Sequence, residues 1–157
     1  QSAQETFHEM IRREVSPTVR SYNAVMLAFK SSGDPDAPEL GEEWLKIMPL
    51  TPTRVTICTL MGIWADSDRP NAAVRVRELL DYLLETSYRR EDDGTVHIIH
   101  EDLLPDAIVF NTCIEAQLKY GEPVHPVIEQ MNRLYDQTGL ARPNELTSRL
   151  MIKKHHR

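Results

Sequence analysis

One segment of the chain, Pro17–Gly33, occurs a second time without gaps as Pro105–Gly121. Proline, an aromatic residue, asparagine, alanine and glycine occupy the same positions in both copies. A weaker copy in the same register runs from Pro52 to Asp68, and a further start appears at Pro143. Such internal repetition is typical of proteins that stack one supersecondary unit, so it predicts an elongated array.

Each copy predicts an amphipathic helix, because its apolar residues recur every three or four positions. Such a helix buries one face and therefore needs a partner helix. After the first copy, Gly33 predicts a left-handed helix stop. Asp36, Pro38 and Glu39 then predict the start of the partner, with Asp36 as N-cap and Glu39 completing a capping box. We expect an all-α fold of stacked helix-turn-helix units.

The repeats divide the chain into units. Residues 1–18 are expected to contain the second helix of an upstream unit, and three units follow at 19–53, 54–106 and 107–144, with the start of another at 145–157. The second unit carries an insertion at about 85–104. Its charged part predicts an exposed loop, and Val96–Ile99 is expected either to pack back on the helices or to form a short extended segment. Trp44 and Trp64 fall on apolar stripes and are expected in the core.

The composition limits the partners of the chain. A net charge of −6 argues against a uniformly basic nucleic-acid surface, although charge can segregate between the faces of an elongated protein. No apolar run reaches membrane-spanning length, so no membrane partner is expected, and no targeting segment is visible.

Catalytic and metal-binding patterns are not found in the sequence. Cys58 and Cys113 lack paired spacing and are expected as reduced core thiols in helices. His97 and His100, with the acidic pair after them, lack further ligands at suitable spacing for a metal. We expect no enzyme activity, no cofactor, no metal and no small-molecule substrate.

The hexapeptides at 21–26 (Ser-Tyr-Asn-Ala-Val-Met) and 109–114 (Val-Phe-Asn-Thr-Cys-Ile) resemble the Thr-Tyr-Asn-Thr-Leu-Ile opening of pentatricopeptide repeats. Pro105-Asp106 resembles the end of such a repeat. The unit from Val19 to Thr53 has 35 residues, which matches the family period of about 35; the next two units have 53 and 38 residues and depart from it by insertion.

This resemblance implies a right-handed α-solenoid whose first helices bind single-stranded RNA on a concave surface, with two side chains reading each base. It assigns base reading to three pairs of residues: Asn23 with Thr53, Cys58 with Asp106, and Asn111 with Asn144. It assigns base stacking to Arg20, Val55, Ile108 and Leu146. Lys30 and Lys119, near the ends of their helices, are expected to contact phosphates.

Asparagine at these positions implies a preference for pyrimidines, and the family chiefly serves RNA processing, stability or translation in mitochondria and plastids. Structural alternatives remain open: Asn23 and Asn111 would satisfy neighbouring polar groups, and Val55, Ile108 and Leu146 would be core between units. The alternative function is a protein-interaction scaffold that uses the same groove. An acidic or neutral groove along the first helices would favour the scaffold over RNA.

Overall fold

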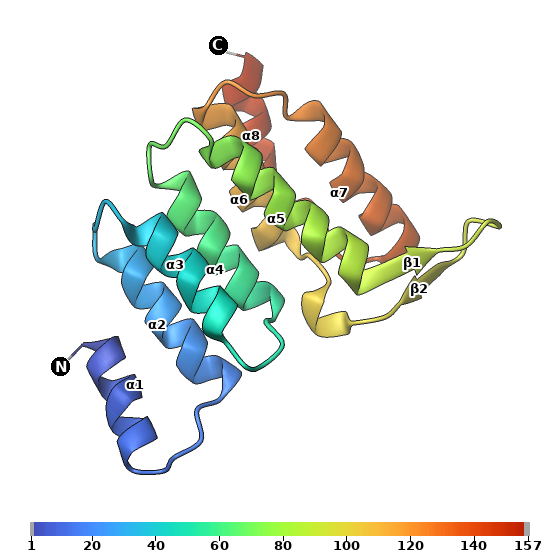
Figure 1. Cartoon of the computed structure of the whole chain (residues 1–157). Helices are drawn as coiled ribbons and strands as arrows, with labels where there is room; N and C mark the ends of the chain where they lie inside the picture. The colour runs from blue at the N-terminus through green and yellow to red at the C-terminus, as the bar shows by residue number, and fades with distance from the viewer. Residues whose placement is uncertain (1, 156–157) are drawn as a thin grey trace.

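The structure is a computed structural model that describes residues 2–155, with side chains through Lys153. It is mostly helical, with eight α-helices and one short β-hairpin in the described residues (Figure 1). The elements are α1 (Ala3–Arg12), α2 (Val19–Ser31), α3 (Ala37–Ile47), α4 (Arg54–Ala65), α5 (Ala72–Ser87), β1 (Tyr88–Arg90), β2 (Val96–Ile98), the 3-10 helix η1 (Glu101–Leu103), α6 (Ala107–Lys119), α7 (His125–Thr138) and α8 (Glu145–His155).

The helices form two groups that alternate along the chain. Helices α2, α4, α6 and α8 pack side by side in that order, and we call them the first-helix row. Helices α1, α3, α5 and α7, the second-helix set, each pack against a neighbouring member of that row (Figure 1). Consecutive helices are therefore neighbours in space, and the chain advances steadily from one end of the molecule to the other.

The buried residues form a continuous core between the two groups. At its N-terminal end, Phe7, Tyr22, Phe29 and Trp44 make edge-to-face and tilted ring contacts. The Trp44 indole donates to the backbone oxygen of Tyr22 at 3.0 Å. Trp64 is also buried, so the expectation that both tryptophans lie in the core is confirmed.

The helix stop expected at Gly33 is confirmed. Gly33 directly follows the C-cap of α2 and has a positive φ of 67°. The expected capping box at α3 is wrong. Asp36 is the N-cap, but its side chain makes no cap hydrogen bond, because its backbone is not in the extended conformation that aims a side chain at the first-turn amides. Glu39 pairs instead with Arg69 in the α4–α5 connection.

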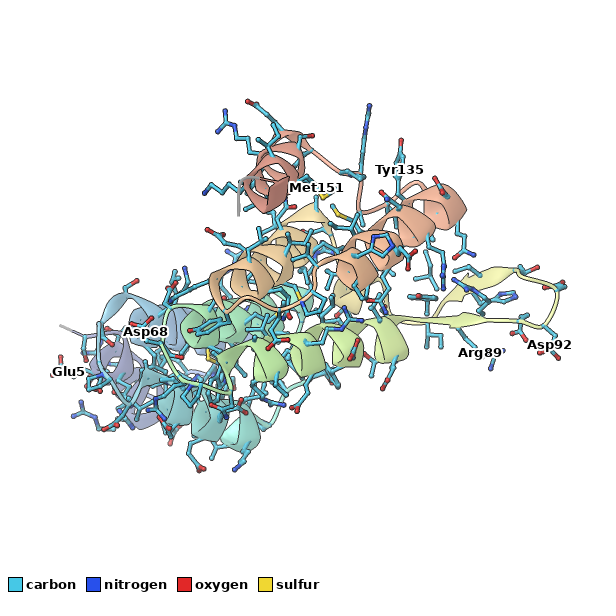
Figure 2. All side chains as sticks on the ribbon, turned by 90° about the horizontal axis from the view of Figure 1, so that it is seen from above. Glu5, Asp68, Arg89, Asp92, Tyr135 and Met151 are labelled. Carbon is cyan, nitrogen blue, oxygen red and sulfur yellow. The ribbon has the colours of Figure 1, made fainter. Side chains whose placement is uncertain are left out.

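The insertion in the second unit is a β-hairpin that extends α5. β1 and β2 pair antiparallel, and the backbone oxygen of Ser87 accepts from the amides of Ile99 and His100 at 2.8 and 3.0 Å. This confirms the expected extended segment. Figure 2 shows Arg89 and Asp92 projecting with the hairpin away from the helices. Its contact with α7 is a hydrogen bond of 2.6 Å from Arg90 to Gln137.

None of the described helices combines the length and the apolar character that a bilayer crossing requires.

Candidate functional site

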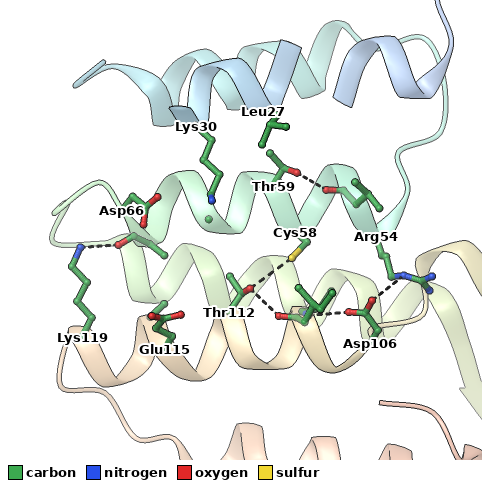
Figure 3. Close-up of a pocket in the computed structure, with 16 residues that line it drawn as sticks. Leu27, Lys30, Arg54, Cys58, Thr59, Asp66, Asp106, Thr112, Glu115 and Lys119 are labelled. Atoms are coloured by element: carbon green, nitrogen blue, oxygen red, sulfur yellow. Dashed lines mark hydrogen bonds and ion pairs between the residues drawn. The ribbon is translucent and has the colours of Figure 1, made fainter. Parts of the chain in front are cut away.

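A groove of about 460 Å³ runs across the first-helix row, lined by residues of α2, α4 and α6 and of their ends (Figure 3). Leu27, Val55 and Ile108 contribute large aliphatic side chains to it, one from each helix. The second-helix set contributes no lining residue. The groove therefore opens on the side of the row that α3 and α5 do not cover.

The residues assigned to base stacking lie on the surface. Val55, Ile108 and Leu146 are 55, 66 and 45% exposed, and Arg20 is also exposed. The alternative that the three aliphatic side chains form core between units is therefore wrong. Each occupies the second position of its helix, so the row presents one such side chain per first helix.

Asn23 connects α2 to the start of α4. Its side-chain oxygen accepts a hydrogen bond of 2.5 Å from the hydroxyl of Thr56, and Thr56 in turn accepts from the backbone amide of Thr53, the N-cap of α4, at 3.1 Å. Sequence reasoning paired Asn23 with Thr53, and the structure joins them through Thr56. Thr56 lies three residues after the N-cap, a spacing that would have identified it.

Asn111 makes the equivalent connection between α6 and α8. Its amide nitrogen donates to the Asn144 side-chain oxygen at 3.0 Å, and its oxygen accepts from the Thr147 hydroxyl at 2.8 Å. The expected proximity of Asn111 and Asn144 is present. However, Asn111 is only 2% exposed, so the expectation that both amides of this pair are open to a ligand is wrong for Asn111. Asn144 is exposed.

The equivalent connection between α4 and α6 is missing, because α6 has Val109 at its third position, where α4 has Thr56 and α8 has Thr147. Cys58, in the position of the asparagines, has its sulfur 3.7 Å from the Thr112 hydroxyl, and burial raises the pKa of its thiol. Asp106 accepts from the Val109 amide at 3.0 Å as the N-cap of α6. Its carboxylate also lies 3.4 Å from the Arg54 guanidinium.

The two lysines assigned to phosphate both line the groove but differ in their partners. Lys119 lies 2.9 Å from the Asp68 carboxylate and donates to the backbone oxygen of Ala65 at 2.8 Å; the hydrogen bond to Asp68 raises its pKa. Within the described residues, Lys30 has no carboxylate at ion-pair distance. Lys30 is therefore the more available of the two cations for a ligand anion.

The charges inside the groove balance. Its lining holds three cationic side chains and three carboxylates: Lys30, Arg54, Lys119, Asp66, Asp106 and Glu115. Two of the three cations are engaged in ion pairs.

Within the helices themselves, charge segregates between the two groups. Among the described side chains, the first-helix row carries six cations against two carboxylates: Arg20, Lys30, Arg54, Lys119, Arg149 and Lys153 against Glu115 and Glu145. The second-helix set carries five cations against ten carboxylates. The row that forms the groove is thus net cationic in a protein of net negative charge.

No cluster of potential metal ligands is present among the described residues. Cys113 is fully buried, and burial raises the pKa of its thiol to about 12, which makes it an inert core thiol as expected. The same expectation is wrong for Cys58, which is only partly buried and lines the groove.

Neither a scan against protein-family models nor a search of curated proteins finds a match to this chain.

Proposed function

We propose that the chain is a right-handed α-solenoid of pentatricopeptide-like units that binds single-stranded RNA, with a preference for pyrimidines, in the groove of its first-helix row. One observation carries the proposal: an exposed side chain suited to stacking occupies the same position of four successive first helices, on the net cationic group of helices. Its cellular setting would be RNA processing, stability or translation in a mitochondrion or plastid.

The exposed aliphatic side chains support base stacking on physical grounds. Leaving a large apolar side chain in water is unfavourable, and bases offer apolar faces that cover it irrespective of sequence. Val55 and Ile108 both line the groove, so a base between them would contact one side chain on each face. Arg20, at the corresponding place in α2, would stack its planar guanidinium.

Sequence selectivity would come from polar groups beside these stacking positions. At the α6–α8 junction that group is Asn144, whose side-chain oxygen is occupied by Asn111 and Thr147. Its side-chain amide nitrogen has no hydrogen-bond partner among the described residues, so it is the atom left to address a base edge.

Fluorescence anisotropy with a short, labelled, pyrimidine-rich RNA at stated salt tests the proposal. We expect binding with a preference over polyadenylate, and a loss of about tenfold in affinity for Ile108→Ser, the scale of one lost base-stacking contact. Val74→Ser is the matched control, because Val74 is 58% exposed but belongs to α5, outside the groove. Equal losses in both variants, or equal affinity for polyadenylate, would count against the proposal.

A protein-interaction scaffold is the second candidate. The groove itself is neutral, which is the outcome expected for a scaffold rather than for RNA. The exposed stacking positions and the net cationic helices of the row are the observations that favour RNA. Apolar walls with equal numbers of cations and carboxylates suit an amphipathic peptide as well as a polyanion. The same Ile108→Ser variant separates the two candidates. A scaffold predicts no RNA binding by the native chain and weaker capture of a peptide partner by the variant.

A further inference from the structure

Lys30 of α2 reaches toward α4 (Figure 3), where its side chain lies over Gly62, near the C-terminal end of that helix. A Cβ atom built at Gly62 would lie 2.5 Å from Cε of Lys30, 3.3 Å from its Cδ and 3.6 Å from its Nζ. No other side chain or backbone atom is among these nearest neighbours. The Gly62 backbone is buried, and the Lys30 side chain lies against it.

Backbone conformation does not explain this glycine. Its backbone is helical, so it is not needed for a positive φ, and glycine in a helix interior is less favourable than alanine. Gly41 of α3 provides the contrast, since a Cβ there would meet Cδ1 of Leu60 at 2.8 Å and of Ile63 at 3.2 Å. Gly41 is packed against core side chains, whereas the three atoms nearest to a Cβ at Gly62 all belong to Lys30.

We infer that Gly62 is a positioning residue that seats the methylene chain of Lys30 against α4, and that this seat forms the phosphate-binding position of the groove. The inference rests on the proposed RNA binding. Lys30 has no ion-pair partner among the described residues, whereas Arg54 and Lys119 are paired with carboxylates. An ammonium group held in place by packing loses less side-chain entropy when it contacts a phosphodiester.

Gly62→Ala tests the seat without disturbing the core. The new methyl group displaces only the flexible end of Lys30, and alanine favours the helix, so the melting temperature should stay the same or rise. Affinity for a pyrimidine-rich single strand should nevertheless fall by about threefold. Lys30→Met, which keeps the length and removes the charge, should lower affinity by about tenfold and reduce the log–log salt slope between about 50 and 200 mM by about 0.7.

Two further variants test whether Gly62 acts through Lys30. In the Lys30→Met background, Gly62→Ala should cause no additional loss of affinity, because its effect acts through the lysine. Gly41→Ala should lower the melting temperature through overpacking against Leu60 and leave the affinity of the folded protein unchanged.

The outcomes separate the inference from the proposed function. Native protein that binds RNA, with a Gly62→Ala variant of equal affinity, overturns the seat and leaves RNA binding in place. The same is true if Gly62→Ala weakens the Lys30→Met variant as much as the native chain. No RNA binding by the native chain overturns both.

Discussion

Asn111 and Asn23 make the same type of connection at different depths, and we expect them to differ in their contribution to stability. Asn111 is 2% exposed and makes two hydrogen bonds, so Asn111→Ala removes both bonds from a buried site. The free energy of unfolding should fall by about 2 kcal/mol. Asn23→Ala, which removes one bond at a half-buried site, should lower it by about 1 kcal/mol. Urea denaturation measures both, and the reverse order would contradict this assignment.

Asn144→Asp should separate base reading from folding. The oxygen that accepts from Asn111 and Thr147 is retained, and aspartate serves as well as asparagine at an N-cap, so stability should change by less than about 0.5 kcal/mol. The substitution exchanges only the unoccupied amide nitrogen for an acceptor. The family resemblance associates the resulting pair with uracil, and we expect a shift from cytosine toward uracil of about 1 kcal/mol. Competition between two strands that differ at one base measures it; an unchanged ratio would remove this pair from the reading residues.

Alkylation of Cys58 reports on occupancy of the groove. Cys58 lines it, half-buried, whereas Cys113 is in the core with a pKa of about 12. With iodoacetamide at mildly alkaline pH, Cys58 should react slowly and Cys113 only after unfolding. A bound strand should slow the modification of Cys58 several-fold, as mass spectrometry would show. Protection by an unrelated single strand of polyadenylate to the same extent would argue against selective binding.

Helix α3 is connected to neighbouring segments by two glutamates, which we expect to contribute differently to stability. Glu42 accepts from the Trp64 indole at 2.9 Å and from Arg75 at 2.6 and 2.9 Å, and is largely shielded; Glu39 pairs with Arg69 at the surface. Glu42→Ala leaves the indole without its acceptor and the Arg75 guanidinium with Glu78 alone, and should cost about 2 kcal/mol.

Glu39→Ala is the matched control for this prediction. Its side chain is 53% exposed, and an exposed ion pair contributes less than about 1 kcal/mol. Thermal unfolding of both variants should therefore give a clearly lower melting temperature for Glu42→Ala only. Similar values for the two would show that α3 is not held through Glu42.

The β-hairpin is separable from the helices. Residues 91–95 form its tip and are largely exposed, so replacing them by Asn-Gly, which suits a two-residue hairpin turn, should change the free energy of unfolding by less than about 0.5 kcal/mol. RNA affinity should not change, because the hairpin contributes nothing to the groove lining. If circular dichroism shows that the variant is folded and its RNA affinity is nevertheless lower, the hairpin would belong to the RNA interface.

Periodicity and turn residues were sufficient to predict the helices and the extended part of the insertion, because both depend on neighbours close in sequence. The cap of α3 was not predictable in the same way. Asp34 accepts from the Asp36 amide at 2.8 Å and shapes the turn, and Glu39 has a partner 30 residues away. Likewise the connection through Thr56 and Thr147, and the seat of Lys30 on Gly62, depend on how neighbouring helices pack, which repetition alone does not show.

For the whole molecule, RNA binding should be moderately dependent on salt. Lys30 and Lys153 of the first-helix row have no ion-pair partner among the described residues, and Arg20 is assigned to stacking, so we expect about two phosphate contacts. The log–log slope of affinity against salt would then be about −1.4. Titrations at several salt concentrations measure it. A slope near zero would be the result expected for an uncharged peptide partner.

The first-helix row and the second-helix set carry opposite net charges on their helices, so these side chains contribute an electric dipole directed from one group to the other. A polyanion approaching the second-helix set would be repelled, and one approaching the first-helix row would be attracted. The electrostatic field would therefore orient the two molecules before contact. Salt should accordingly act mainly on the association rate and leave the lifetime of the complex nearly constant. If the chain binds RNA as proposed, its overall negative charge would weaken random encounters with nucleic acid while the first-helix row still attracts the strand.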